Sequence, residues 1–415
     1  MQESVNTNIT ANTGVQRVGV IPFFIYILLV CATTIAMPQG RLTYLFQRFV
    51  QVVEILVFLL LNIRLMMKYH SLHIDRFQLL VHFWWMVIII SSFIIVRPFQ
   101  LSEVNLWLNV CVFLLMINTY WELSGREHIR MLAFVFSFLV YLNGILFLMF
   151  PDGIWIETDW IGAGDKARYL FGNYNQTGVV ILMALLVNGI YSIVYRKGKL
   201  NMFLLMLVGT ATVFAMGSTT STIGLLIVSL YYIFRRFIRH PHVIISIFIA
   251  LYIGFFAMVV WGGANIDEMP RLAAFVENVL GKDSTFTARV PLWFMSVKLI
   301  LSQPFFGYGP QNPEWMVQSI GGSGPHNLWL MFMLQGGLLL TGLFVLILVK
   351  IFRTLFKARL QSGIFALVCC CVLLLMSLFE TYHIVCVFMI LIISYYSKNF
   401  GNIDNSVKTT DERCD

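Results

Sequence analysis

Runs of about 20 apolar residues recur along the chain, and this feature limits its fold more than any other. A helix needs about 20 residues to cross the hydrocarbon layer of a bilayer. The chain of 415 residues is 59% hydrophobic and 12% charged, whereas about a quarter of a soluble domain is charged. The runs are continuous rather than alternating, as in membrane helices and not in barrel strands. We therefore predict an all-α integral membrane protein with about twelve transmembrane helices.

The predicted spans are 18–37, 45–63, 78–96, 104–121, 131–150, 172–195, 200–217, 221–238, 242–260, 327–349, 361–379 and 383–397. They place transmembrane helices 1–9 in residues 18–260 and helices 10–12 in residues 327–397, on either side of a large extracytoplasmic loop at 261–326. Residues 1–17 are rich in Asn and Thr and are expected to be disordered. Residues 398–415 form a short tail. No small-residue cleavage site follows the first apolar run, so a signal peptide is not expected.

Basic residues gather in the connections on one side of the predicted topology. Clusters of Lys and Arg lie at 64–76, 126–130, 196–199, 235–239 and 350–359. The positive-inside rule then places both chain termini in the cytoplasm. The formal net charge of +8 thus reflects topology and contact with anionic membrane lipids. Nucleic acid is not an expected partner, because no basic stripe lies on a soluble domain.

Sequence motifs for metals and nucleotides do not occur in this chain. The seven cysteines lack metal-ligand spacing, and most fall inside predicted spans, where cysteine behaves as a small buried hydrophobe. There is no Walker loop, no dinucleotide-binding glycine motif and no HExxH sequence. We therefore expect no cofactor and no metal.

Two loops on the side opposite to the basic clusters are longer than the rest. Loop 151–171 contains Asp152, Glu157, Asp159 and Asp165, followed by Lys166 and Arg168. Loop 261–326 contains periodic apolar residues at 272–280 and a second helical stretch at 290–301. Loops of this length are usually functional or disordered. We expect short helices on the membrane surface, beside a polar pocket that faces the outer leaflet.

Within the larger loop, two residues suit chemistry on a phosphorylated lipid. Arg289 begins an amphipathic stretch that ends in a turn at 304–309. A glycine-rich segment then delivers His326 and Asn327 to the first turn of the next membrane helix. The donor fork of arginine fits phosphate oxygens, and histidine suits proton transfer near neutral pH. The alternatives are a headgroup anchor for Arg289 and a cap or packing role for His326.

Four stretches occur in order around these loops. They are Arg168 with FGNYNQTG at 171–178; MGSTTS at 216–221; Arg289 with Trp293, Pro304, Gly307 and Gly309; and Pro325–His326–Asn327 with Gly336 and Gly337. Together they resemble the bacterial O-antigen polymerase and O-antigen ligase superfamily, which are membrane glycosyltransferases with a GT-C-like fold. In the second stretch, Thr219 stands where the family often has an arginine.

The resemblance implies a metal-independent glycosyltransferase in the bacterial cytoplasmic (inner) membrane. Its donor and acceptor would be oligosaccharides linked to undecaprenyl diphosphate, used at the outer face. Because the diphosphate already activates the donor, no nucleotide sugar or ATP is required. A polysaccharide chain-length regulator and membrane lipids are the other expected partners. The product would be a surface polysaccharide such as O-antigen of lipopolysaccharide or capsule.

The resemblance and the local chemistry together assign roles to single residues. We expect Arg289, with Arg168 from the first outer loop, to bind the diphosphate and to stabilise the charge on the leaving group. His326 would take the proton from the acceptor hydroxyl. The candidates for sugar binding are Asn175, Asn327, Glu380 and His383. Glu380 is also a rival candidate for the base.

Three functions remain open at this stage. A polymerase that joins repeat units is favoured because polymerases are the commoner members of the superfamily. A ligase that transfers the finished glycan to lipid A core is the first alternative. A polysaccharide flippase or other transporter is the second, since twelve spans also suit a carrier. Against a carrier, the chain has no evident inverted repeat.

Overall fold

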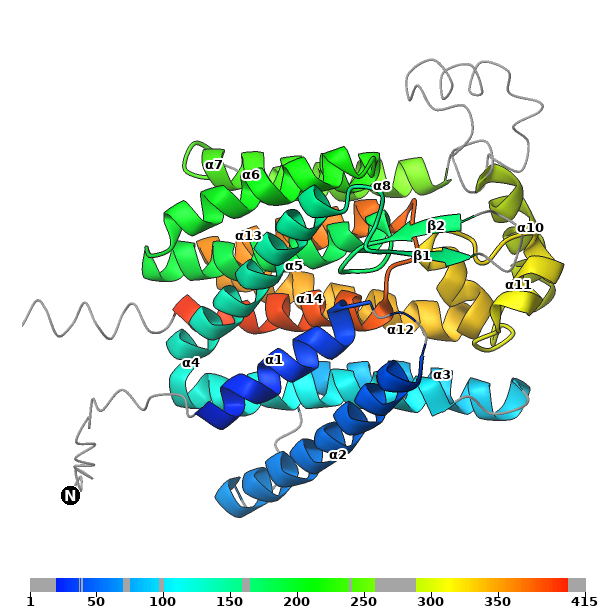
Figure 1. Ribbon diagram of the computed structural model, residues 1–415, viewed down its shortest axis with the longest axis horizontal. Helices are drawn as coiled ribbons and strands as arrows, with labels where there is room; N and C mark the ends of the chain where they lie inside the picture. Colours follow the sequence, from blue (N-terminus) through cyan, green and yellow to red (C-terminus); the bar gives the residue numbers. More distant parts are fainter. Residues whose placement is uncertain are drawn as a thin grey trace, which may run out of the picture.

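The computed structural model describes residues 20–36, 38, 40–69, 75–96, 101–158, 165–238, 241–257 and 289–401. These residues form a bundle of long helices with one small β-hairpin (Figure 1). The predictions for residues 1–17, 261–288 and 402–415 lie outside the described residues. The larger outer loop is therefore described only from residue 289 onward.

Most predicted spans coincide with single helices, although their ends differ by several residues. These helices are α1 (Val20–Thr34), α2 (Arg41–Tyr69), α3 (Arg76–Ile95), α5 (Tyr174–Tyr195), α6 (Lys199–Ala215), α7 (Thr219–Phe234), α8 (Pro241–Phe256), α12 (Leu328–Ala358), α13 (Gln361–Ser377) and α14 (Ile384–Tyr396). A short 3-10 helix, η3 (Ser397–Gly401), follows α14. Two further helices, α10 (Arg289–Ser302) and α11 (Pro313–Ile320), lie in the predicted outer loop. The first corresponds to the helical stretch predicted at 290–301, the second had no predicted range, and the periodic stretch at 272–280 lies outside the described residues.

The predicted loop between spans 104–121 and 131–150 was wrong. A single helical stretch, α4 (Leu101–Met149), covers both spans. The residues between them include the helix formers Glu122, Leu123 and Glu127, and no proline interrupts the stretch. A straight helix of this length would measure about 74 Å, more than twice the hydrocarbon thickness. It therefore contains two apolar halves joined by a helical connection.

Hydropathy and exposure both identify a multi-pass membrane protein. Among the described residues, five helical segments are long and apolar enough to cross a bilayer. They are Arg41–Ile63, Arg76–Ile95, Glu127–Met149, Tyr174–Tyr195 and Leu328–Ala358. The outer faces of several helices carry exposed apolar side chains, such as Leu60, Phe134 and Phe214. An apolar surface of this kind suits contact with lipid rather than water. The total of twelve spans stays a prediction.

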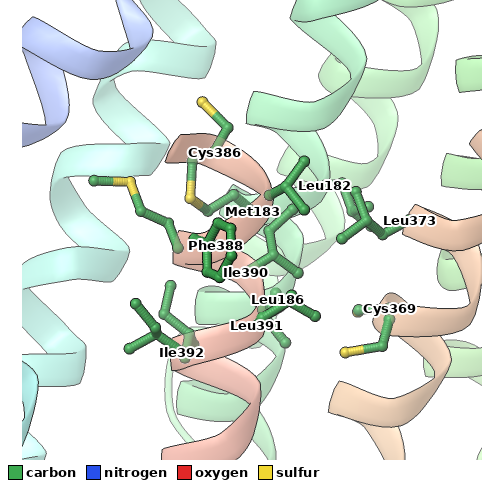
Figure 2. Close-up of a cluster of buried hydrophobic side chains, with 14 of the residues drawn as sticks. Leu182, Met183, Leu186, Cys369, Leu373, Cys386, Phe388, Ile390, Leu391 and Ile392 are labelled. Carbon is green, nitrogen blue, oxygen red and sulfur yellow. The ribbon is translucent and has the colours of Figure 1, made fainter. Parts of the chain in front are cut away.

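The interior of the bundle is built around α5, α13 and α14. Residues 177–190 of α5 and nearly all of α13 and α14 are buried. Leu182 and Leu186 of α5 meet Leu373 of α13 and Leu391 of α14 in an apolar cluster (Figure 2). Five of the cysteines, among them Cys369, are buried, as predicted for small hydrophobes.

A glycine sets the spacing between α5 and α13. A Cβ atom at Gly189 would lie 2.1 Å from a ring carbon of the buried Phe365, so alanine must push the two helices apart. We expect Gly189→Ala to destabilise the solubilised protein by about 1–3 kcal/mol, measured as a lower thermal unfolding temperature. Gly342→Ala on α12 is the matched control, because nothing lies within 4 Å of its Cβ position. An unchanged unfolding temperature for Gly189→Ala would contradict this packing.

The helix connections gather at two opposite ends of the bundle. In Figure 1 the hairpin of β1 (Trp155–Thr158) and β2 (Asp165–Arg168), together with α10 and α11, lies at the right. The start of α1 and the end of η3 lie at the left, so the described chain begins and ends on one side. The hydroxyls of Ser192 and Tyr232, near the ends of α5 and α7, lie 2.5 Å apart. Which end faces the cytoplasm stays a prediction.

Candidate active site

Glu380 lies in the short connection between α13 and α14 and receives three polar side chains from distant segments. His326 Nδ1 lies 2.9 Å from Glu380 Oε1, and Arg289 Nη2 lies 3.4 Å from Glu380 Oε2. Asn175 Nδ2 donates a hydrogen bond to the same Oε2 atom. These four residues form what we call the Glu380 cluster. It unites one carboxylate, one guanidinium, one imidazole and one amide.

The connection that carries Glu380 is tied to two neighbouring helix starts. Gln176 Nε2 donates to the carbonyl of Thr381 at 3.0 Å, and Gln176 Oε1 accepts from the backbone N–H of His383 at 2.9 Å. Asn327 Nδ2 donates to the carbonyl of Leu378 at 3.0 Å. The connection is therefore held on both sides of Glu380, which fixes where the carboxylate points.

A second layer of hydroxyl groups orients Asn175. Ser218, the residue before α7, donates from its hydroxyl to Asn175 Oδ1 at 2.9 Å. The hydroxyls of Ser218 and Ser221 are also 2.9 Å apart. Because Oδ1 of Asn175 is occupied as an acceptor, its amide NH₂ is left to donate to Glu380. Sequence reasoning noted the Ser218 stretch only as a motif and assigned it no role.

Arg289 is held in place by a backbone carbonyl next to Glu380 as well as by the Glu380 carboxylate. It is the first residue of α10, and its Nη1 atom donates to the carbonyl of Phe379. One turn later, Trp293 Nε1 donates to the carbonyl of Pro325 at 2.8 Å, and Trp293 is buried. The start of α10 is thus fastened to the residue that precedes His326. The Arg and Trp of the third motif therefore both hold the start of α10 against neighbouring segments.

His326 occupies an unusual backbone conformation directly before α12. Its φ angle is 47°, in the left-handed region that few residues other than glycine adopt. Asn327 follows as the N-cap of α12, and its Oδ1 accepts from the N–H groups of Trp329 and Leu330 at 3.0 and 3.1 Å. The left-handed turn directs the imidazole back toward Glu380 rather than along the helix. The His326 side chain remains 36% exposed.

The two glycines of the fourth motif interrupt the helical backbone of α12. The turn of the third motif packs against α12 at this interruption. Gly336 and Gly337 have non-helical backbone angles, and the N–H of Leu338 donates to the carbonyl of Pro304 at 2.8 Å. A Cβ atom at Gly307 would lie 2.4 Å from the carbonyl oxygen of Leu334. The glycines therefore permit direct backbone contact between the turn after α10 and the interior of α12.

The charges around Glu380 decide its protonation. Burial acts to raise the pKa of its carboxyl group, but the hydrogen bond and charge of His326, the charge of Arg289 and the N–H of Thr381 outweigh burial. The pKa of Glu380 is therefore held below its ordinary value of 4.5. Glu380 is a carboxylate at neutral pH, and the cluster pairs it with at least one full positive charge.

Acid is expected to weaken this cluster. Because folding lowers the pKa of Glu380, its ionised form stabilises the protein above the ordinary pKa, and this contribution is lost as the pH falls through the lowered value. We expect the solubilised protein to unfold at a higher temperature than its Glu380→Gln variant near pH 7, and this difference to shrink below about pH 4. Glu127→Gln, at a more exposed ion pair, is the control. A Glu380→Gln difference independent of pH would contradict the assignment.

The other predicted site residues have different surroundings. Arg168 ends β2 and its Nε lies 2.5 Å from Glu157 Oε2 of β1; no described contact joins it to Arg289. The side chain of Asn327 is fully buried; it caps the start of α12 and donates a hydrogen bond to the connection that carries Glu380. His383 is exposed, and its recorded bond to Gln176 uses the backbone N–H. The structure thus brings together Arg289, His326, Asn175 and Glu380, but not Arg168 or the His383 side chain.

A comparison with known families supports the motifs. Residues 202–345 match the family model of the O-antigen ligases. The match runs from α6 into α12, so it includes Arg289 and His326, while Asn175 and Glu380 lie outside it. No curated protein matches the chain. The matched part of the chain is therefore similar to proteins described as O-antigen ligases. Residues 202–345 are thus similar to the O-antigen ligase family, in agreement with the resemblance found in the sequence motifs.

Proposed function

We propose that the chain is a surface polysaccharide polymerase that joins undecaprenyl-diphosphate-linked oligosaccharide repeat units at the outer face of the cytoplasmic membrane. The observation that carries the proposal is the Glu380 cluster, in which Arg289 and His326 approach one carboxylate from two sides. Arg289 begins α10, which lies at the end of the bundle opposite to the described chain ends (Figure 1). With the chain termini in the cytoplasm, this end meets the outer leaflet, where lipid-linked repeat units are exposed.

In this proposal His326 is the base and Glu380 is its positioning residue. With the Nδ1–H of a neutral imidazole donated to the Glu380 carboxylate, Nε2 is left as an acceptor for the proton of the sugar hydroxyl. The carboxylate also stabilises the imidazolium that forms, as in other base–orienter pairs. Glu380 itself is a poor base for this step, because its pKa is lowered below 4.5. The exposure of His326 leaves its ring open to a substrate.

Arg289 would bind the diphosphate of the donor. Its guanidinium has five N–H groups that can donate hydrogen bonds. One terminal nitrogen donates to the Phe379 carbonyl, and the other donates to Glu380. The remaining N–H groups and the positive charge are available to phosphate oxygens. As the bond between the anomeric carbon and the diphosphate oxygen breaks, negative charge grows on the leaving group, and Arg289 stabilises it. This fixed position lowers the cost of reorganisation during transfer.

The transfer needs one displacement. The acceptor hydroxyl oxygen forms a bond to the anomeric carbon of the donor, its proton passes to His326, and undecaprenyl diphosphate leaves. The anomeric configuration is inverted and no covalent enzyme intermediate is required. The membrane helices hold both lipid-linked chains near one another, which reduces the entropic cost of the encounter. All of the driving force comes from the activated donor.

The geometry changes the roles proposed for four other residues. Asn175 and Glu380 act through their bonds to the cluster, while Asn327 positions the start of α12. For Arg168 to bind the diphosphate, phosphate oxygens must replace Glu157 as its partner. His383 remains a candidate sugar ligand because it is exposed at the same connection as Glu380. We therefore expect weaker effects from Arg168 and His383 than from Arg289 and His326.

The family name favours a second candidate, an O-antigen ligase that transfers the finished glycan to lipid A core. The two candidates share the donor chemistry and differ in the acceptor. Lipid-linked glycans that accumulate after deletion of the gene distinguish them. Single repeat units on undecaprenyl diphosphate indicate loss of a polymerase, and long chains on the carrier indicate loss of a ligase. Neither species would accumulate at the outer face if the protein were a flippase, and that result would overturn both assignments.

A further inference from the structure

An apolar groove of about 290 Å³ lies between α7, α8 and α13, away from the Glu380 cluster. Its walls consist of aliphatic and aromatic side chains and one cysteine, including Leu230, Tyr231, Phe234, Phe248 and Cys371. No charged side chain lines it. Helix α13 packs against both α7 and α8. The groove therefore opens sideways from helices that stand in the membrane, which makes hydrocarbon its natural content.

The groove lies toward the end of the bundle that is opposite to the candidate active site. Tyr231 and Phe234 belong to the last turn of α7, next to the contact between Tyr232 and Ser192 at the end of α5. At the start of α8, the ring of His242 lies 5.0 Å from that of Phe356, near the end of α12. A lipid in this groove would therefore present its headgroup at the end away from Glu380.

A hydrocarbon chain alone cannot decide which lipid occupies the groove. An empty groove would lose dispersion contacts along its walls, so an acyl chain is expected to fill it. All membrane lipids have such chains, and apolar side chains gain little by choosing among them. Any preference must then come from the groups at the end of the groove, where a headgroup would lie.

Two arginines follow the groove-lining turn of α7. The guanidinium of Arg235 lies 4.2 Å from the Tyr232 ring centroid and interacts electrostatically with Tyr231, which lines the groove. The Arg235 Nε atom is buried and has no hydrogen-bond partner among the described residues, and Arg236 is exposed. Within the described part of the chain, neither arginine is paired with a carboxylate. Their charge is therefore not neutralised by those residues.

Exposed phenylalanine side chains lie beside these arginines at the end of α7. Phe234 is 50% and Phe237 is 78% exposed, and their rings lie 6.5 Å apart. Lys and Arg are enriched in the cytoplasmic connections next to membrane helices. Basic pockets between membrane helices bind anionic headgroups. The groove and the two arginines thus form the two halves of one lipid site.

We infer that this groove binds an anionic glycerophospholipid, with one acyl chain between α7, α8 and α13 and with its phosphate beside Arg235 and Arg236. This site is separate from the site for the lipid-linked glycan. It joins α8 to α7 and to α13, the helix that leads into the Glu380 connection. The bound lipid therefore stabilises the packing of the helices that hold the catalytic end in place.

Native mass spectrometry of the purified full-length protein in detergent tests this inference. The protein is titrated with dioleoyl phosphatidylglycerol or with dioleoyl phosphatidylcholine, and the affinity of the tightest lipid is measured. A basic residue near an anionic surface changes affinity by about fivefold. We expect Arg235→Gln with Arg236→Gln to weaken phosphatidylglycerol binding by about fivefold for each charge. Lys197→Gln with Lys199→Gln removes two exposed charges from the neighbouring connection and is the matched control.

A second variant tests the groove without a change in charge. Leu230 lines the groove and is 53% exposed, so Leu230→Trp fills the space from its rim; it is expected to lose the bound lipid while its unfolding temperature without lipid stays unchanged. Equal binding of phosphatidylcholine, or equal losses in the lysine control, would overturn the inference. So would undecaprenyl phosphate binding in the groove more tightly than phosphatidylglycerol.

Discussion

Replacement of His326 by alanine is expected to lower the rate of glycan transfer by about 10²–10⁴-fold, the usual contribution of a general base. The imidazole is held by Glu380 at 2.9 Å, and the Glu380 cluster contains no second histidine. In the wild-type protein the hydrogen bond and charge of His326, together with the charge of Arg289, hold the pKa of Glu380 below its ordinary value, so Glu380 is the poorer base there. Transfer is measured as polymer formed in a deletion strain that carries the variant at wild-type protein level.

The control for this variant is a histidine at the other end of the bundle. His242 packs against Phe356 and has no contact with the Glu380 cluster among the described residues, so His242→Ala should transfer glycan at the wild-type rate. His326→Gln separates hydrogen bonding from proton transfer, because glutamine can donate to Glu380 but cannot serve as a base near neutral pH. Full-length polymer at a normal rate from either His326 variant would show that the base is another group.

Replacement of Arg289 by alanine is expected to reduce transfer by about 10²–10³-fold, as does the loss of a single group that stabilises transition-state charge. Alanine also leaves the buried Glu380 carboxylate with one charged partner fewer. Arg289→Lys should recover only a small part of the rate, because one ammonium group cannot reach the Phe379 carbonyl, Glu380 and a phosphate oxygen together. Initial rates at saturating lipid-linked substrate measure this difference.

Two comparisons make the Arg289 result specific. Arg130→Ala removes a more exposed arginine that pairs with Glu127, and it should leave the rate unchanged. Arg168→Ala should have a smaller effect than Arg289→Ala, because Arg168 already pairs with Glu157. Full activity of Arg289→Lys would mean that a positive charge alone suffices at this position. An effect of Arg168→Ala equal to that of Arg289→Ala would instead indicate that both arginines bind the diphosphate.

The sequence predicted the helices well because each membrane span is a local property. The apolar runs of α5, α13 and α14 are continuous over almost their whole length, and the bilayer fixes the length that such a run needs. The loop expected near residues 122–130 was wrong for a related reason. Charged residues such as Glu122 and Arg126 are favourable in a helix, so polarity ended the membrane signal there without ending the helix.

The site was predictable only in part, because its partners are far apart in the sequence. Arg289 and His326 could be named from local chemistry and from motif resemblance. Their meeting point could not, since Glu380 lies 54 residues from His326 and 205 residues from Asn175. A single sequence holds no signal for that pairing. The bond from Ser218 to Asn175 was missed for the same reason.

The motif glycines illustrate a different limit. Gly307 and Gly337 were read as a turn and as a family motif, but the structure gives them a packing role, in which two backbones touch directly. Turn chemistry marks where a chain bends and does not say what it bends against. The same limit applies to Arg168, where charge and position suggested a phosphate ligand and the fold supplied Glu157 as its partner.

Reconstitution of the purified protein with one substrate tests the central claim most directly. Proteoliposomes receive undecaprenyl-diphosphate-linked repeat units and no nucleotide, and the glycans are separated by length over time. The Glu380 cluster predicts a ladder of longer lipid-linked chains from the wild-type protein, with one undecaprenyl diphosphate released per linkage, and no ladder from His326→Ala. An equal ladder from the His326→Ala protein would contradict the assignment of the Glu380 cluster as the catalytic centre.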